Sequence, residues 1–366
     1  MKTKKTIAVA MSGGIDSSVT AAILIEKGYN VIGITMLVCP LSCGGEGETE
    51  KAEPSVDAKC VCDQLGIEHH ILDLRKEFKK TVIDYFIREY FYGRTPNPCV
   101  KCNPKIKFGL LLNFVLDLGA DLLATGHYSR VVKNSETGLF EIHRGIDKSK
   151  DQSYVLYRLN QAQLSHIVFP MGGMKKVDMK DYAQKIDLSV TDKPESQEIC
   201  FIPDNDYQGF LKRNCDLAIK PGPIIHKNGE ILGQHRGLIS YTVGQRKRLG
   251  ISHHKPLFVI DIDAGNNTLI VGYFEDQFKR EAVLEDVRWI SGCPPVNNRI
   301  CAKIRYGDRV SPALFEILPG EEKGRSSQLK IIFDEPKRAI TPGQSAVIYT
   351  YPDGDVLLGG GIITRS

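Results

Sequence analysis

The first 125 residues alternate strand-length apolar runs with segments of helical period. Short continuous apolar runs are typical of buried strands, and apolar positions spaced three and four apart are typical of helices. We therefore expect strands at 6–11, 31–37, 68–74 and 121–125, and helices at 19–27, 55–65, 76–92 and 105–119. Strands that alternate with helices indicate an α/β fold, in which a parallel sheet is covered on both faces.

Three loops are expected to meet at one end of this sheet. They begin at Ser12, Val38 and Gly126, each directly after a predicted strand. The carboxyl ends of parallel strands lie along one edge, and ligands of such sheets bind in the crevice beyond that edge. The sequence therefore predicts that residues of these three loops line a common site.

The pattern changes in the second half of the chain. Glycine and proline punctuation increases after about residue 205, and short alternating runs dominate from about residue 282. Such runs predict a small β-barrel or sandwich. We expect three domains, at 1–204, 205–280 and 281–366, and the Gly- and Glu-rich stretch 43–54 is the best candidate for a disordered loop.

Composition places the chain among ordinary globular proteins. Its 366 residues are 42% hydrophobic and 25% charged, and the net charge of +4 permits a polyanionic partner without requiring one. The sequence predicts no membrane span and no signal peptide, because its lysine-rich start leads into a strand. We therefore expect a cytoplasmic protein whose ten cysteines are reduced, so that clustered thiols become candidates for catalysis or metal binding.

Residues 12–18 read Ser-Gly-Gly-Ile-Asp-Ser-Ser and stand between a predicted strand and a predicted helix. Backbone N–H groups and a helix N-terminus converge at such a turn, which suits a phosphate group. Gly13 and Gly14 allow a close backbone approach, whereas Asp16 would repel a bare phosphate and is expected to hold Mg²⁺ or orient the loop. The lysine of the Walker motif is missing. The simpler alternative is a Ser/Gly turn that caps a helix.

A loop at 93–104 with three prolines carries a C-x-x-C pair, Cys99 and Cys102. Asn103 suits a helix N-cap and Pro104 suits a first helical position, so Cys102 is expected just before a helix N-terminus. The helix dipole and nearby lysines would then favour a thiolate, which makes Cys102 a candidate nucleophile. The alternative is a buried structural cysteine. The lysines are Lys101, Lys105 and Lys107.

The C-x-x-C pair alone leaves its chemistry open. It fits a redox couple, half of a zinc site or part of an iron–sulfur site, and no second such pair exists to complete a zinc ribbon. Cys200 lies far along the chain, and spacing alone does not place it beside Cys102. Of Cys60 and Cys62, one is expected in the core and neither as a ligand. No role is favoured for Cys39 and Cys43, and packing positions are expected for Cys215, Cys293 and Cys301.

Six segments together resemble the tRNA-specific 2-thiouridylase family, which thiolates the wobble uridine of tRNA. The resemblance covers nearly the whole chain, and the segments occur in the family's order. The first segment alone marks the broader class of enzymes that split ATP into AMP and pyrophosphate, and the others are far more specific. The segments are AMSGGIDSS at 10–18, GRTPNPCVKCN at 93–103, ATGHYSR at 124–130, KDQSYVLYRL at 150–159, KPESQEICFIP at 193–203 and GQHRGLISYTVGQRKRLGI at 233–251.

The resemblance implies a fold and a reaction. The fold is a PP-loop, Rossmann-like domain that binds adenine nucleotide, followed by a small tRNA-contacting domain and a C-terminal β-barrel. In the reaction, AMP is transferred from ATP to the C2 oxygen of uridine 34, and a persulfide sulfur then displaces AMP. Mg²⁺ and the phosphate loop would offset the charge. Cys102 would be the nucleophile and Cys200 the persulfide carrier, and a reversible disulfide between them would close the cycle.

The family's binding residues are also implied at matching positions. The phosphate loop would comprise Ala10, Met11, Ser12, Gly13, Gly14, Ile15, Asp16 and Ser17, and Met36 and Gly126 would contact adenosine. The pocket for the flipped target base would be formed by Asn97, Pro98 and Cys99. The tRNA contacts would be His127, Lys150, Asp151, Gln152, Arg305, Tyr306 and Gln344, and Arg246, Lys247 and Arg248 fit a phosphate-contacting patch.

Cys99 departs from the pattern of many family members, which carry aspartate there as a proposed acid or base. That role does not transfer to a thiol. Instead, Cys99, Cys102 and Cys200 could hold an iron–sulfur cluster with one iron open to hydrosulfide. The sequence leaves the persulfide and cluster routes open.

Two other function classes remain as alternatives. One is an ATP-pyrophosphatase amidotransferase or ligase that acts on a small molecule, which leaves the cysteine motif unexplained. The other is a non-catalytic RNA-binding or iron–sulfur protein. For the leading interpretation, the expected partners are tRNAs for Lys, Glu and Gln and a sulfur-donor protein or sulfide, and the expected state is a monomer.

Overall fold

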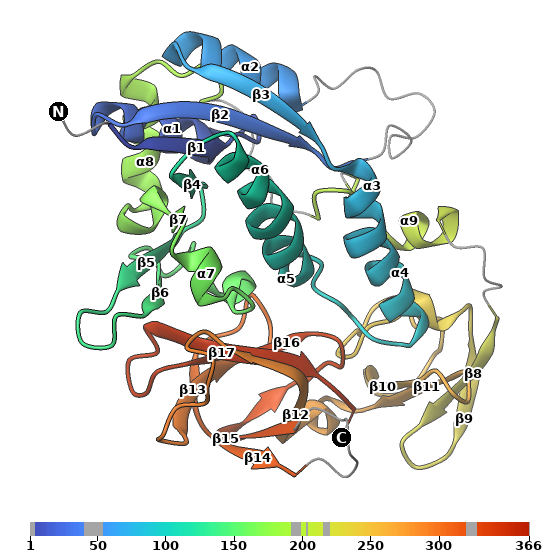
Figure 1. Cartoon of the computed structure of the whole chain (residues 1–366). Coiled ribbons are helices and arrows are strands. Elements are labelled where there is room, and N and C mark those ends of the chain that lie inside the picture. Colours follow the sequence, from blue (N-terminus) through green and yellow to red (C-terminus); the bar gives the residue numbers. More distant parts are fainter. Residues whose placement is uncertain are drawn as a thin grey trace.

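The computed structural model describes residues 4–39, 54–191, 199–202, 204–214, 220–319 and 328–365. A five-stranded sheet lies at one end of the molecule and a barrel at the other, and helices run between them (Figure 1). Cys43, Cys215 and nearly all of the loop predicted at 43–54 fall outside the described residues.

The N-terminal sheet is parallel, as predicted, in the order β3-β2-β1-β4-β7. Side chains of a strand alternate between its two faces. Ile7 and Val9 accordingly pack on one face with helices α1, α2 and α8, while Ala8 packs on the other against Phe108 and Leu111. The strands are β1 (Thr6–Ala10), β2 (Asn30–Leu37), β3 (Glu68–Asp73), β4 (Leu122–Ala124) and β7 (Ile167–Val168), and the helices are α1 (Ile15–Glu26), α2 (Pro54–Leu65) and α8 (Lys176–Lys185).

The strand order reverses at β1, since β2 and β3 lie on one side of it and β4 on the other. Such a reversal opens a crevice beyond the carboxyl ends of the two strands that flank it. The loop after β1 carries Ser12, and the loop after β4 carries Gly126. The topology therefore places these two loops on opposite sides of one crevice.

Two long helical stretches lead from the sheet toward the barrel (Figure 1). The first joins α3 (Arg75–Phe78), the π-helical η2 (Lys79–Ile83) and α4 (Asp84–Phe91). The second joins α5 (Cys99–Cys102), the π-helical η3 (Asn103–Leu111) and α6 (Leu112–Asp117). This second stretch begins at Cys99, well before the start predicted at Asn103. Pro104 lacks an N–H, and the helix widens into its π segment at this point.

The C-terminal strands close into a six-stranded antiparallel barrel in the order β12-β15-β14-β13-β16-β17, with β12 paired to β17. The predicted short strands are confirmed, and the long β12 extends further toward the N-terminus than the pattern indicated. The strands are β12 (Phe278–Trp289), β13 (Arg299–Lys303), β14 (Ser311–Leu318), β15 (Gln328–Arg338), β16 (Ser345–Tyr349) and β17 (Val356–Ile363).

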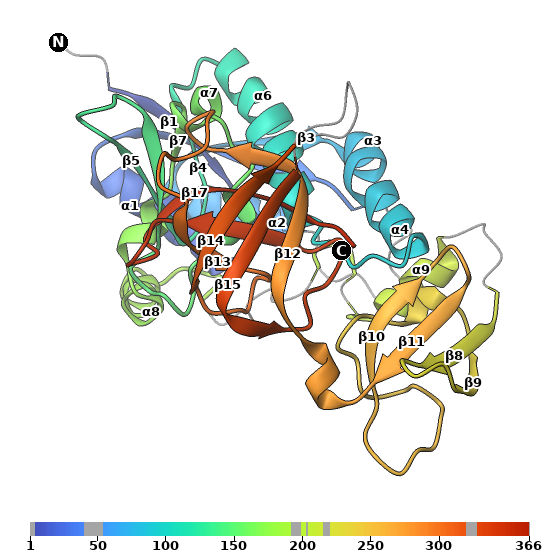
Figure 2. The ribbon, with the colours of Figure 1, turned by 90° about the horizontal axis from the view of Figure 1, so that it is seen from below.

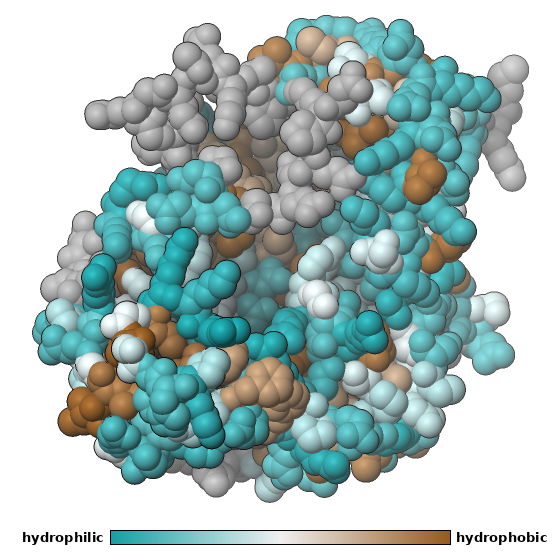
Figure 3. Space-filling view, turned by 180° about the vertical axis from the view of Figure 1, so that it is seen from behind, coloured by the Kyte–Doolittle hydropathy of each residue, from teal (hydrophilic) through white to brown (hydrophobic). Residues whose placement is uncertain are grey.

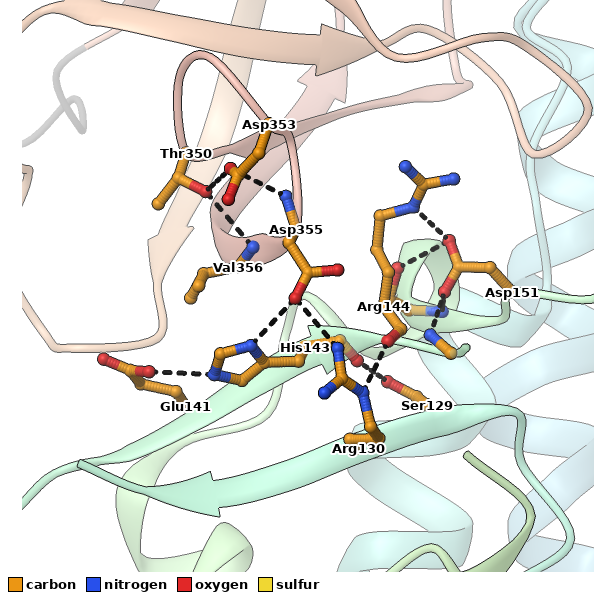
Figure 4. A network of polar contacts seen from close by, with 12 residues as sticks. Ser129, Arg130, Glu141, His143, Arg144, Asp151, Thr350, Asp353, Asp355 and Val356 are labelled. Carbon is orange, nitrogen blue, oxygen red and sulfur yellow. Dashed lines mark hydrogen bonds and ion pairs between the residues drawn. The ribbon is translucent and has the colours of Figure 1, made fainter. Parts of the chain in front are cut away.

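A hairpin from the N-terminal half extends the barrel sheet. It consists of β5 (Ser129–Lys133) and β6 (Phe140–Arg144), and β6 pairs with β17. Asp355 accepts hydrogen bonds from Arg130 at 2.8 Å and lies 3.0 Å from Nδ1 of His143, which joins the hairpin to the barrel (Figure 4). The alternation pattern did not reveal this hairpin.

A tyrosine-rich turn, the 3-10 helix η4 (Ser153–Leu156), fixes the same junction. Tyr154 is fully buried, and its hydroxyl donates to the carbonyl oxygen of Ser345 at 2.8 Å. The ring of Tyr157 lies against Gly360 of β17, where a Cβ would stand only 3.0 Å from the ring. The two tyrosines therefore anchor the sheet domain in the barrel wall.

The remaining described segments form a smaller body beside the barrel (Figure 2). Its four-stranded sheet has the order β10-β11-β8-β9 and its own apolar core. The strands are β8 (Gly222–His226), β9 (Ile231–His235), β10 (Phe258–Asp263) and β11 (Thr268–Gly272).

The further helices of the chain are α7 (Gln161–Leu164), η5 (Pro170–Gly173), α9 (Tyr207–Arg213), η6 (Leu238–Ser240) and η7 (Phe274–Gln277). In the described parts of the chain, no helix has the length and apolar character needed to cross a bilayer.

Replacing Tyr154 by phenylalanine tests the junction. The variant leaves the buried carbonyl of Ser345 without this donor, which costs about 1–3 kcal/mol. We expect a lower midpoint of thermal or urea unfolding. Tyr92→Phe is the matched control, because Tyr92 is 58% exposed. Equal midpoints for the two variants would show that the anchor contributes nothing.

Candidate active site

The glycine-rich loop connects β1 to α1 as predicted, but the helix begins at Ile15, so Asp16 and Ser17 belong to its first turn. Gly13 has a φ of 72°, a region that glycine adopts readily. The hydroxyl of Ser17 donates to the carbonyl of Gly14 at 2.9 Å and accepts from the N–H of Ser12 at 3.2 Å. These bonds hold the turn in shape around the helix N-terminus.

Asp16 is held by groups from two distant segments. Its Oδ1 accepts from the hydroxyl of Tyr128 at 2.8 Å and lies 2.7 Å from Nζ of Lys176. Lys176 is 6% exposed, and its ammonium also lies 5.4 Å from the centre of the Tyr128 ring. The sequence showed no lysine in the loop motif. The fold supplies one from the first turn of α8, where only tertiary structure could reveal it.

Gly126 lies directly against the helix N-terminus. A Cβ at this position would stand 2.9 Å from Cβ of Asp16 and 3.0 Å from its carbonyl carbon. Met36, the other expected adenosine contact, is partly buried near the end of β2 and packs against the neighbouring cores. The phosphate loop and the loop after β4 thus meet with no room for a side chain between them.

Four thiols gather beyond the end of β2. Cys200 interacts electrostatically with Cys102, Cys99 and Cys39. The sulfur of Cys39 also donates to the carbonyl oxygen of Cys200 at 3.4 Å. No disulfide joins cysteines in the portion of the chain that the structure describes. The structure therefore unites Cys102 with Cys200, which spacing could not, and adds Cys39, for which the sequence favoured no role.

Phe201 anchors this assembly. It is 1% exposed, and its ring centre lies 5.7 Å from that of Phe78, 5.4 Å from Phe86 and 5.3 Å from Phe210. Cys102 and Cys39 pack against the same apolar cluster. Burial of the residue after Cys200 therefore holds Cys200 beside the helix that carries Cys102.

Burial has the largest effect on the pKa of the thiols Cys99, Cys102 and Cys200. It raises the pKa of Cys102 to about 11, with Lys107 opposing the shift. Desolvation is also the largest cause that raises the pKa of Cys99 and Cys200, although both residues keep solvent-exposed surface. This direction is opposite to the thiolate that the sequence predicts at Cys102, because desolvation disfavours the charged form of the thiol.

Only one of the three predicted lysines acts on the thiols. Lys107 lowers the pKa of Cys99, Cys102 and Cys200. Lys107 is five residues beyond Cys102, and the i-to-i+5 bonding of the π segment η3 brings such positions onto one side. Lys101 instead lies 3.8 Å from Asp286 and over the ring of Tyr85.

Asn97, Pro98 and Cys99, the residues expected to form the base pocket, stand at the start of the helix that carries the thiols. Asn97 accepts from the N–H of Cys99 at 3.0 Å, and thus performs the capping role that the sequence assigned to Asn103. Pro98 follows it at the helix start. The barrel holds Thr95, two residues before Asn97. The N–H of Thr95 donates to the carbonyl oxygen of Pro342 and its own carbonyl accepts from the side chain of Gln344, each at 2.8 Å.

The expected tRNA residues occupy two environments. His127 is 8% exposed between Phe108 and Phe169, and burial, followed by Lys107, holds its pKa well below the ordinary value. Asp151 is 5% exposed and accepts from Arg144 and Ser153. These side chains face inward.

The other expected tRNA residues are more open. Gln152 accepts from the N–H of Tyr128 at 2.9 Å, and Lys150 is partly exposed. Arg305 and Tyr306 are exposed on the barrel, and Tyr306 interacts electrostatically with Cys99. The barrel surface thus reaches the thiol centre through Tyr306.

The other cysteines lie elsewhere. Cys62 is buried and Cys60 exposed, as predicted for that helix, and Cys301 is buried in the barrel. Cys293 is exposed, so its predicted packing role is wrong. The pattern alone could not show that the turn around Cys293 lies on the outside of the barrel.

The reactivity of Cys102 tests the burial effect. The thiolate is the reactive form, and below the pKa of about 11 its fraction rises about tenfold for each pH unit. Alkylation of Cys102 by iodoacetamide, followed by peptide mass spectrometry, should therefore accelerate from about pH 7 to about pH 10 without a plateau. Lys107→Ala should slow the reaction by up to about tenfold, whereas exposed Lys105→Ala should not. A plateau near neutral pH would contradict the assignment.

Gly126→Ala tests the contact at the phosphate loop. The added methyl group forces the loop away from Asp16, and such overpacking costs about 1–3 kcal/mol. We expect affinity for adenine nucleotide, measured by calorimetry, to fall about tenfold, which corresponds to 1.4 kcal/mol. Gly173→Ala is the control, because its Cβ would meet nothing within 4 Å. Unchanged affinity in Gly126→Ala would place the nucleotide elsewhere.

Comparison with known proteins identifies matching families along nearly the whole chain. The tRNA methyl transferase HUP domain family matches residues 5–204, the tRNA methyl transferase PRC-barrel domain family residues 208–273, and the aminomethyltransferase beta-barrel domain family residues 279–363. Among solved structures, a U34-tRNA thiolase of Methanococcus maripaludis with its 4Fe-4S cluster is 21% identical, with a TM-score of 0.35 over 58% of this chain and 68% of that chain.

Full-length relatives are much more similar. The tRNA-specific 2-thiouridylase MnmA of Carboxydothermus hydrogenoformans is 45% identical over 368 residues, which cover 99% of this chain and 98% of that protein. The enzyme of the same name from Clostridioides difficile is 44% identical over 365 residues, covering 99% of each chain. The three matching domain families and this full-length similarity together show that the chain belongs to the tRNA-specific 2-thiouridylase family.

Proposed function

We propose that this protein uses ATP to place sulfur on C2 of wobble uridine 34 in tRNA, giving 2-thiouridine, AMP and pyrophosphate. The observation that carries the proposal is that Cys102 packs in the same apolar cluster as Phe201, the residue after Cys200, and that Cys102 acts electrostatically on Cys200. A phosphate site activates an oxygen as a leaving group, and paired thiols deliver a sulfur atom. The reaction needs both.

The phosphate loop, residues 10–17, receives the nucleotide, while Met36 and Gly126 border the adenosine. Lys176 offsets negative charge as the C2 oxygen takes AMP and pyrophosphate departs. A magnesium ion held mainly by phosphates needs only one or two protein carboxylates, which Asp16 satisfies. Such an ion would supply charge neutralisation.

The sulfur step follows from the two thiols. Cys200 carries a persulfide, whose terminal sulfur attacks C2 and expels AMP. The thiolate of Cys102 then attacks the Cys200 sulfur, breaks its bond to the transferred sulfur and releases 2-thiouridine. A disulfide between Cys102 and Cys200 remains, and an external dithiol must reduce it. The bonds formed and broken balance without any other oxidant.

An iron–sulfur cluster is the other route that the sequence left open. Cys99, Cys102 and Cys200 are neighbours, but within the described residues no three His, Cys, Asp or Glu side chains are arranged to hold a metal ion. We therefore derive no step through a cluster. Cys99 instead borders the base pocket with Asn97 and Pro98.

The tRNA surface is proposed to run from the thiol centre across the barrel and the central domain. Tyr306 and Arg305 are exposed near Cys99. A hollow of about 480 Å³ in the central domain, distant in sequence from the thiols, suits phosphate contacts because it is lined by Arg246, Arg248, His253, His254 and Lys255. Figure 3 shows a largely hydrophilic face with a hollow near its centre.

The remaining expectations complete the proposal. His127, Lys150, Asp151, Gln152 and Gln344 act by shaping the site, since several of them face inward. The substrates are tRNAs for Lys, Glu and Gln, and a sulfur-donor protein or sulfide supplies the sulfur. The protein acts as a monomer in the cytoplasm, with domains at 1–204, 205–280 and 281–366.

Nucleoside mass spectrometry tests the function. tRNA incubated with the protein, ATP, Mg²⁺ and a persulfide source should gain one sulfur on uridine 34. Cys102→Ser and Cys200→Ser should each abolish this gain while tRNA-dependent pyrophosphate release persists, because activation precedes sulfur transfer. Cys60→Ser, on the exposed side of α2, is the control.

Other outcomes point to other functions. Thiolation in either cysteine variant would refute the persulfide route. Pyrophosphate release that depends on ammonia or an amine instead of tRNA would favour a small-molecule ligase. Activity lost with removal of iron, and restored with iron and sulfide, would favour the cluster.

A further inference from the structure

Cys39 has no part in the reaction described above, yet it lies against the thiol that carries the sulfur. Its Sγ donates to the carbonyl oxygen of Cys200 at 3.4 Å. It follows β2, so it stands at the carboxyl edge where the active site is built. Its side chain packs against the apolar cluster that also holds Cys102 and Phe201.

The geometry suits a bond between Cys39 and Cys200. The carbonyl oxygen of a residue is only a few bonds from its own Cβ, so Cys39 Sγ is already close to the Cys200 side chain. A disulfide needs Cβ atoms about 3.5–4.5 Å apart. The backbone sets that separation and small backbone shifts adjust it, while rotation about χ1 of each cysteine turns the two sulfurs toward one another. Cys99, Cys102 and Cys39 also act electrostatically on the Cys200 thiol, so all three lie within its surroundings.

The other described cysteines do not offer this arrangement. Cys62 is enclosed beside Gly33, Cys301 is buried in the barrel, and Cys60 and Cys293 are exposed elsewhere. None of them contributes to the electrostatic surroundings of Cys200. Cys99 and Cys102 occupy the first turn of one helix, whereas Cys39 approaches Cys200 from a separate strand end.

We propose that Cys39 is the resolving thiol of this centre and forms a disulfide with Cys200 after each sulfur transfer. This inference rests on the proposed function, which leaves a Cys102–Cys200 disulfide. The thiolate of Cys39 attacks the Cys200 sulfur, the bond between Cys200 and Cys102 breaks, and its electron pair leaves with Cys102 as a thiolate. The proton of Cys39 passes to water. One disulfide replaces another, so the exchange involves no net oxidation.

The exchange regenerates Cys102 for the next cycle. The Cys39–Cys200 disulfide is then reduced to two thiols by a small dithiol or a dithiol protein, the class of reductant that the cycle already requires. Cys200 is exposed, so a reductant can reach this disulfide.

Disulfide mapping tests the pairing without depending on thiolation activity. The Cys102→Ser protein is treated with one equivalent of diamide, alkylated, digested without reduction and analysed by mass spectrometry. We expect a Cys39–Cys200 linkage as the main product and its loss in the Cys39→Ser, Cys102→Ser double variant. Cys60→Ser in the Cys102→Ser background is the matched control and should keep the linkage. Recovery of Cys39 as the alkylated thiol, with Cys200 joined to Cys99 or to nothing, would overturn the proposal.

Turnover separates this proposal from the proposed function. In Cys39→Ser, with a dithiol as the only reductant, the steady-state rate should fall about tenfold more than the single-turnover rate. The Cys102–Cys200 disulfide should accumulate at the same time. Equal effects on both rates, or none on either, would reject the resolving role. If the wild-type protein forms no 2-thiouridine in a single turnover, the proposed function itself fails, whatever the disulfide map shows.

Discussion

The burial of Phe201 is the interaction on which the chemistry depends. Phe201 follows Cys200 directly and packs edge-on against Phe78 and Phe86. Fully burying a phenylalanine side chain contributes about 1.5–3 kcal/mol, and aromatic pairs add to this. Cys200 itself lies in a turn and is exposed. Its position beside Cys102 therefore comes from the packing of its neighbour.

The same burial determines the protonation state of the thiols. Surrounding protein disfavours the charged form, so Cys102 rests as a thiol with a pKa of about 11. A thiol of higher pKa forms less thiolate but a more nucleophilic one. Lys107 is the cation that moderates this effect for Cys99, Cys102 and Cys200.

Hydrogen bonds join the sheet domain to the barrel at several points. Thr95, just before the helix that carries the thiols, is bonded to the barrel on both its N–H and its carbonyl. Two further bonds join the same parts of the chain: Tyr154 donates to the carbonyl oxygen of Ser345, and Asp355 of the barrel accepts from Arg130. The barrel thus fixes the start of the helix that carries Cys99 and Cys102.

The sequence by itself determined the parallel sheet, the glycine-rich turn between its first strand and helix, and the all-β character of the C-terminal part, because hydrophobic period and glycine placement are local signals. Local cues were misleading at Pro104, where a proline suited to a helix start lies in the π segment 103–111 of a helical stretch that begins at Cys99. Only the tertiary structure determined that the hairpin 129–144 pairs with the barrel, that Lys176 contacts Asp16 and that Cys39 lies against Cys200. Each joins segments far apart in the chain, and their contacts depend on packing that no local pattern encodes. The thiol pKa values belong to the same class, since desolvation exists only once the surrounding protein is in place.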